Sequence, residues 1–200
     1  IGKPIIQKKW FSIAYLQPLL SLNGNTFFRN LILQACIAFL IFKGVGFGST
    51  SAAINAILMQ FFTLIALGLD GVAYAAEALV GEQKGDKNAK GIIQVTLHGL
   101  LWSSVVAVFY SLVFVIWGTD IISIITDQET LQLEMQDYLI FVYCLPLIAH
   151  WCFFFDGVFV GLTRARAMRN SMLLCALAVY FPAFWMFLSF AEWLLRYKFV

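Results

Sequence analysis

The sequence predicts an all-α fold, a polytopic membrane helix bundle with about five spans. Of the 200 residues, 62% are hydrophobic and only 12% are charged, whereas soluble domains average about 25% charged residues. Five apolar stretches reach the roughly 20 residues that a helix needs to cross a bilayer. The charged residues gather mainly in the segments between these stretches. An integral membrane protein satisfies all three observations.

Breaks in the apolar pattern set the expected bounds. Residues 1–24 carry three lysines and an amphipathic stretch from Phe11 to Leu22, which is typical of a cytoplasmic linker lying on the membrane surface. Glycines after residue 43 end the first span, and the fourth and fifth spans each contain a proline. We expect a transmembrane bundle over residues 25–200, with spans at about 27–45, 51–80, 92–117, 138–162 and 171–195.

The positions of Lys and Arg predict the orientation. The N-terminal segment and the loops at 82–90 and 163–169 hold nearly all of these cations, whereas residues 119–134 hold four acids and neither Lys nor Arg. Cytoplasmic loops carry the excess of Lys and Arg, so both cationic loops are expected inside and 119–134 in the periplasm. Five spans then leave Arg196 and Lys198 outside, so we expect the chain to be part of a longer protein with a further span.

Several functions are disfavoured by composition. A net charge of +2, with no basic run among aromatic residues, gives no sign of nucleic-acid binding. The four cysteines lie in apolar stretches without metal-ligand spacing, so we expect buried apolar residues and no metal site. Neither a nucleophile elbow nor a phosphate-binding loop is present. An enzyme is not expected.

The second span carries a polar stripe. At about 100° per residue, five of its polar side chains fall within an arc of roughly 100°: Asn55, Thr63, Asp70, Tyr74 and Glu77. A stripe of this kind faces a protein interior or an aqueous cavity rather than lipid. Asp70 lies about eleven residues, or roughly 16 Å, from the inner end of the span. It is therefore expected near the membrane midplane.

Each acid of this stripe has two interpretations. Asp70 either couples transport to an ion or makes a satisfied polar contact between helices. Glu77, nearer the inner headgroups, either has a functional role or pairs with a lysine of the following loop. An ionised side chain left unpaired in hydrocarbon costs several kcal/mol, so each must find a partner, water or a proton.

The fourth span offers a third acid, Asp156. It precedes a GxxxG pattern, Gly157 to Gly161, which typically packs closely against another helix. Asp156 either takes part in coupling or pairs with Arg164 near the inner interface. His150, in the same span, is either a packed residue or a proton relay.

Two arginines each begin a span on the inner side and are followed by asparagine: Arg29 and Arg169. One interpretation is that they snorkel to lipid phosphates. The alternative is an inner-side ionic gate with Glu77 or Asp156.

Two segments resemble a known family. LDGVAYAAEA (residues 69–78) is similar to the eighth-helix signature of DinF-type MATE transporters. FDGVFVGLTR (155–164) and MRNSM (168–172) resemble the tenth helix and the start of the eleventh. Order and spacing also match, and the resemblance covers nearly the whole chain from about Leu19.

The resemblance implies a twelve-helix antiporter built from two six-helix lobes. Such proteins expel organic, often cationic, compounds against an inward proton or sodium gradient. The five spans would be helices seven to eleven, so the N-terminal lobe and the final helix would be missing partners. The tenth-helix acid of some branches falls on Asp156. The seventh-helix acid of sodium-linked branches has no counterpart, because residues 26–30 read TFFRN.

We therefore expect cation-coupled efflux of a small organic substrate across the bacterial inner membrane, with a proton favoured over sodium and no bound cofactor. Alternatives are a truncated, non-transporting remnant or scaffold, and a lipid flippase of related fold. The candidate residues are Asp70, Asp156 and Glu77 for coupling, Asn55, Thr63 and Tyr74 for the cavity lining, and Arg29 and Arg169 for the gate.

Overall fold

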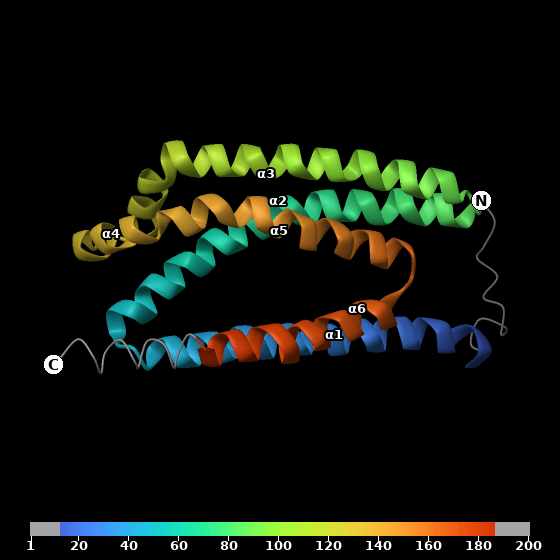
Figure 1. The fold of residues 1–200 in the computed structure, drawn as a ribbon, viewed down its shortest axis with the longest axis horizontal. Coiled ribbons are helices and arrows are strands. Elements are labelled where there is room, and N and C mark those ends of the chain that lie inside the picture. Colours follow the sequence, from blue (N-terminus) through green and yellow to red (C-terminus); the bar gives the residue numbers. More distant parts are fainter. Residues whose placement is uncertain (1–12, 187–200) are drawn as a thin grey trace, which may run out of the picture. The chain divides into compact units, whose positions relative to one another are not determined.

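The computed structural model describes residues 13–186, and its elements are helices joined by short turns. The described residues contain no strand, which confirms the all-α prediction. Figure 1 shows the order of the elements: α1 (Ile13–Val45), α2 (Ser49–Gly85), α3 (Ala89–Ile125), α4 (Glu129–Met135), the short 3₁₀ turn η2 (Gln136–Tyr138), α5 (Leu139–Gly161), α6 (Ala165–Cys175) and the π turn η3 (Ala176–Tyr180).

Five helical stretches of the described chain are long and apolar enough to cross a membrane, as the sequence predicts. The first begins within α1, which is already helical from Ile13, so part of the segment expected to be a linker is continuous with the span. Its location on the membrane surface stays a prediction. Residues 187–195 of the expected fifth span lie outside the described residues. The stretches are Asn23–Val45, Ser49–Gly85, Ala89–Ile125, Glu129–Gly161 and Ala165–Met186.

The chain divides into two compact units. One, Phe39–Thr163, contains α2, α3 and α5 and is called here the three-helix unit. The other, the terminal unit, combines Ile1–Ala38 with Arg164–Val200. The polar stripe and Asp156 belong to the three-helix unit, so the candidate coupling residues lie within that unit.

Aromatic and branched side chains fill the core of the three-helix unit. Phe61 of α2 and Phe114 of α3 are almost fully buried, and their rings meet edge to face with centroids 5.3 Å apart. Ile65, Leu69 and Val142 extend this core toward α5. Lipid tails are as apolar as these side chains, so close packing rather than the hydrophobic effect must hold the helices together.

Two glycines bring α5 into backbone contact with α2. A β-carbon at Gly157 would overlap the carbonyl of Ala73, and one at Gly161 would lie 2.6 Å from the Glu77 carbonyl oxygen. Both positions advance by four residues together, so the two helices run parallel through this contact. The GxxxG pattern is confirmed as a close-packing device.

Polar contacts join α3 to α5 inside the same unit. The buried Ser103 Oγ lies 3.3 Å from Nδ1 of the buried His150, so this histidine is packed and has a polar neighbour, whereas a role as a proton relay stays a prediction. Ser111 Oγ donates to the Tyr143 carbonyl oxygen at 2.7 Å. Pro146, inside α5, lacks the N–H that would bond one turn back. The carbonyl left without its usual donor is that of Val142, one residue before the carbonyl that Ser111 bonds.

The two cationic loops begin at the same end of the three-helix unit. Lys84 Nζ, in the last turn of α2, donates to the Leu162 carbonyl oxygen at 2.8 Å and also bonds the Thr163 hydroxyl. These acceptors lie just beyond the C-terminus of α5, where a cation also favours the helix dipole. The structure therefore agrees with the expectation that both loops face one side of the membrane.

Which side that is can be tested by labelling. In the complete protein in intact cells, a cysteine replacing Asp127 should react with a membrane-impermeant thiol reagent, because the acidic segment is expected in the periplasm. A cysteine replacing Lys87, at the opposite end of α3, should react only after the cells are opened. Labelling of the Lys87 position in intact cells, with protection of the Asp127 position, would reverse the orientation.

The terminal unit pairs α1 with α6 and η3. Arg169 Nη1 donates to Asn25 Oδ1 at 2.8 Å, and the Tyr180 hydroxyl donates to the Cys36 carbonyl oxygen at 2.8 Å. The π turn at Ala176–Tyr180 comes shortly before Pro182. A proline cannot donate to the preceding turn, which accounts for the widened turn at that point.

Candidate functional site

The candidate site lies on the side of the α2–α5 pair that α3 leaves uncovered. Ala73 contacts Gly157 and so marks the side of α2 that faces α5. Phe61 and Gly68, which contact α3, lie about 120–140° to one side of Ala73 on the helical wheel. Asp70 and Glu77 lie about 40–60° to the other side. Asp70 and Glu77 therefore project away from α3.

Asp156 projects away from α3 as well. On α5, Phe154 packs against Gly99 of α3 and lies about 60° to one side of Gly157, while Asp156 lies about 100° to the other. Since α2 and α5 are parallel and face each other, the opposite senses of these offsets point to the same side of the pair. Asp70, Glu77 and Asp156 thus share one surface, which we call the acid face.

Two of the three carboxylates have no partner in the described part of the chain. Asp70 and Glu77 are half-buried, and among residues 13–186 neither makes a hydrogen bond or an ion pair. Lys84, one of the loop lysines with which Glu77 would pair in the structural interpretation, is bonded to the end of α5 instead. Asp156 is also half-buried but does have an interaction partner. The acid face therefore combines one engaged carboxylate with two that remain available.

The other polar residues of the stripe differ in their exposure and in how much of their hydrogen-bonding capacity is already used. The Tyr74 side chain is 68% exposed. Thr63 donates its hydroxyl hydrogen to the Met59 carbonyl oxygen of its own helix at 2.8 Å, so only its acceptor capacity remains. Asn55 lies against Gly44 in the last turn of α1 and lines a pocket of about 260 Å³ there. The stripe is thus polar along its length, but only its inner part carries charge.

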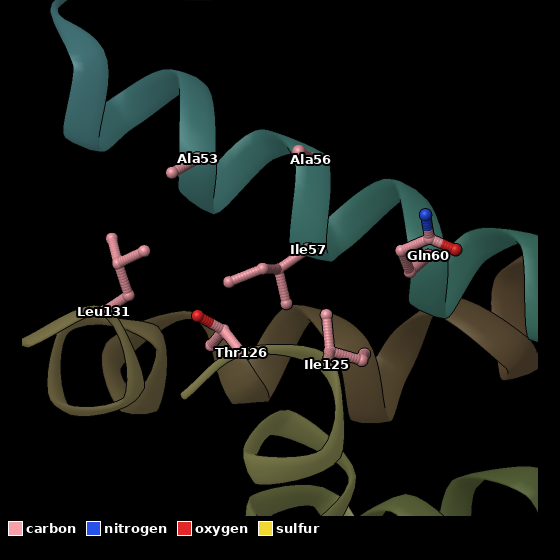
Figure 2. A pocket seen from close by; sticks show the side chains of 7 residues that line it. All are labelled: Ala53, Ala56, Ile57, Gln60, Ile125, Thr126 and Leu131. Atoms are coloured by element: carbon pink, nitrogen blue, oxygen red, sulfur yellow. The ribbon is translucent and has the colours of Figure 1, made fainter. Parts of the chain in front are cut away.

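Gln60 is a polar residue that the arc in the sequence did not include. It lines the pocket beside Asn55 and also a second pocket of about 240 Å³ between the start of α2 and the α3–α4 connection. Figure 2 shows this second pocket, in which Ile57 points toward Ile125 and Thr126. On the helical wheel Gln60 lies about 40° beyond the edge of the arc. A slightly wider arc would have found it.

The proposed inner-side gate stays a prediction. Arg29 and Arg169 belong to the terminal unit, whereas Glu77 and Asp156 belong to the three-helix unit. Arg169 bonds Asn25 and the neighbouring Asn170. A double-mutant cycle in the complete protein would measure any energetic coupling between Arg169 and Glu77. A cycle that showed no coupling would favour the interpretation in which the arginines snorkel to lipid phosphates.

No three His, Cys, Asp or Glu side chains gather closely enough within residues 13–186 to hold a metal ion. Half-buried carboxylates in a membrane helix are costly to retain unless they face water, an ion or a partner.

The sequence matches the MatE family model over residues 26–186. The chain belongs to the MATE family. That match includes all the candidate residues named above, and it confirms the resemblance seen in the eighth-, tenth- and eleventh-helix segments. MATE proteins are membrane transporters, so the five long apolar helices agree with the family.

A MATE relative is DNA damage-inducible protein F of Escherichia coli K12. The two are 38% identical over 158 residues, which is 79% of this chain and 34% of the relative. The chain therefore spans about a third of the length of that protein. No solved structure matches.

Proposed function

We propose that this chain is most of the C-terminal lobe of a MATE efflux antiporter of the bacterial inner membrane. It would expel organic, often cationic, compounds in exchange for protons. The observation that carries the proposal is the acid face, with Asp70 and Glu77 unpaired in the described part of the chain. In the complete transporter this face would line the path between the two lobes.

The proposed mechanism follows from the cost of burying charge. When the cavity is open to the periplasm, water and protons reach the carboxylates. Loss of water as the cavity closes favours the neutral, protonated form of a carboxylic acid. After the cavity opens to the cytoplasm, a cationic substrate favours the ionised form and displaces the proton. Each ligand thus shifts the equilibrium between the two states through its different affinity for them.

A proton is favoured over sodium because of what α1 lacks. Sodium binding needs several hard oxygen ligands, preferably with more than one charge, and residues 26–30 supply no carboxylate (TFFRN). A proton needs a single carboxylate. The scaffold alternative would require the acids to pair internally, and Asp70 and Glu77 do not do so among the described residues.

The proposal is tested with the complete protein in proteoliposomes. We expect a proton gradient alone to drive accumulation of a fluorescent organic cation, and a sodium gradient alone to drive little. Residues 1–200 without the partner lobe should transport nothing, because alternating access needs two lobes around a cavity. Equal flux with both gradients collapsed would overturn antiport, and flux driven only by sodium would replace the coupling ion.

A further inference from the structure

A third pocket lies between α2 and α3, in the half of each helix nearer the turn that joins them. Its volume is about 680 Å³, larger than either pocket near Asn55 and Gln60. Small residues, Gly71 and Ala75 on α2 and Gly99 on α3, leave the hollow, and Trp102 forms part of its wall. We call this recess the α2–α3 groove.

The groove and the acid face lie on different sides of α2. On the helical wheel, the groove residues Gly68, Gly71 and Ala75 lie about 100–160° away from Asp70. A helix whose polar stripe faces the transport path turns its other side to lipid. The groove therefore faces the hydrocarbon if, as proposed above, the acid face lines the path.

The α3 wall of the groove changes in polarity with depth. Lys90, Gln94, His98 and Trp102 follow one another at intervals of four residues, so they lie along one stripe of α3, and all four are exposed. The last three line the groove. The stripe thus runs from a cation through an amide and an imidazole to an indole. A phospholipid shows the same order, from phosphate through glycerol esters to acyl chain.

The depth of these residues fits the bilayer. The 37 residues of α3 extend about 55 Å at 1.5 Å per residue, against a hydrocarbon core of about 30 Å. If α3 is centred, about eight residues at each end lie beyond the core. Lys90 then lies among the headgroups, Gln94 in the interface and Trp102 within the hydrocarbon.

The side chains of the stripe offer suitable partners. His98 Nδ1 lies 2.8 Å from the Gln94 carbonyl oxygen. A carbonyl only accepts, so Nδ1 carries the hydrogen, and in the neutral ring Nε2 is left as an acceptor, which can bond a lipid hydroxyl but not an ester oxygen. The Gln94 amide can donate to ester oxygens, and the Lys90 ammonium suits a phosphate. Lys87 lies in the turn nearby, whereas Lys84 is already bonded to the end of α5.

We propose that the α2–α3 groove binds an anionic phospholipid of the inner leaflet. One acyl chain fills the hollow beside Gly71 and Ala75, the ester region lies at the Gln94 amide, and Lys90 binds the phosphate. The lipid would be a bound component of the lobe, separate from the transported substrate.

The test uses the complete protein, purified with phosphatidylglycerol or with phosphatidylcholine and examined by native mass spectrometry. We expect phosphatidylglycerol to be retained in preference. Ala75→Leu, which fills the groove, should lower the retained lipid about tenfold, and Lys90→Gln should remove the preference for the anionic lipid. The matched controls are Ala78→Leu, an exposed α2 position outside the groove, and Arg166→Gln, an exposed cation in the first turn of α6, outside the three-helix unit.

The outcomes separate this proposal from the transport proposal, because lipid retention is measured without flux. Equal retention by Ala75→Leu and Ala78→Leu, or no preference for phosphatidylglycerol, would overturn the lipid site. Displacement of the lipid by a transported organic cation would assign the groove to the substrate instead. If Ala75→Leu fails to fold, Trp102→Ala, which removes an exposed groove wall, should lower retention in its place, and unchanged retention there would count against the site.

Discussion

The complete transporter carrying Asp70→Asn should reach the membrane in normal amounts and lose most of its coupled efflux. Asparagine keeps the size and polarity of the side chain but cannot bind or release a proton at neutral pH. Asp70 is half-buried and has no hydrogen bond or ion pair among residues 13–186, so the change breaks no contact in the described structure. Removing a charge that costs roughly 3 kcal/mol at the membrane centre should not destabilise the fold.

The measurement is proton-driven uptake into inverted vesicles across a range of pH, with the amount of protein determined by immunoblot. Asp86→Asn is the matched control, because Asp86 is an exposed acid of the α2–α3 turn. The Asp86→Asn variant should transport normally. Efflux by the Glu77→Gln and Asp156→Asn variants measures how much each of the other two carboxylates of the acid face contributes to coupling. Unchanged efflux with unchanged pH dependence in Asp70→Asn would reduce Asp70 to a structural contact and pass its role to Asp156.

Gly157→Ala should have the second large effect, on folding rather than on coupling. The added methyl group would overlap the carbonyl of Ala73 and lie against its backbone, which cannot rotate away as a side chain can. Overpacking of this kind costs about 1–3 kcal/mol, which outweighs the gain of roughly 1 kcal/mol that alanine brings to an ordinary helix position. We expect less protein in the membrane and a lower unfolding temperature in detergent.

The control for this change is Gly71→Ala on α2, where a β-carbon meets nothing within 4 Å. That variant should be as stable as the parent or slightly more stable. If Gly157→Ala and Gly71→Ala unfold at the same temperature, the α2–α5 backbone contact is not what holds the helices together.

The sequence alone predicts the helices and much of the polar stripe, because both depend on local periodicity. Apolar stretches of sufficient length mark the spans, and the glycines after residue 43 mark the first turn. The first three helices nevertheless extend further than predicted: α3, for example, reaches from Ala89 to Ile125. Apolarity shows where hydrocarbon begins, whereas a helix continues until its backbone is capped, as at Asn88, whose side chain accepts from the Gly91 amide.

The arrangement of neighbours was beyond the sequence. A helical wheel shows that Asp70 and Glu77 share a side but not which side α3 covers, since that depends on contacts such as Gly68 with Tyr110. Likewise, the GxxxG pattern predicts close packing against another helix but does not identify Ala73 as the residue contacted. The bond of Lys84 to the Leu162 carbonyl joins positions 78 residues apart, and no local pattern records it.

The glycine contact between α2 and α5 has a consequence for how the acid face works. With two backbones touching at Gly157 and Gly161, there is little room for one helix to slide or turn against the other, because close-packed interiors resist small displacements. The rigid α2–α5 pair therefore fixes the spacing between Asp70, Glu77 and Asp156. In the proposed transport cycle the surroundings of these carboxylates change (water, a cation or an opposing wall), whereas their positions relative to one another do not.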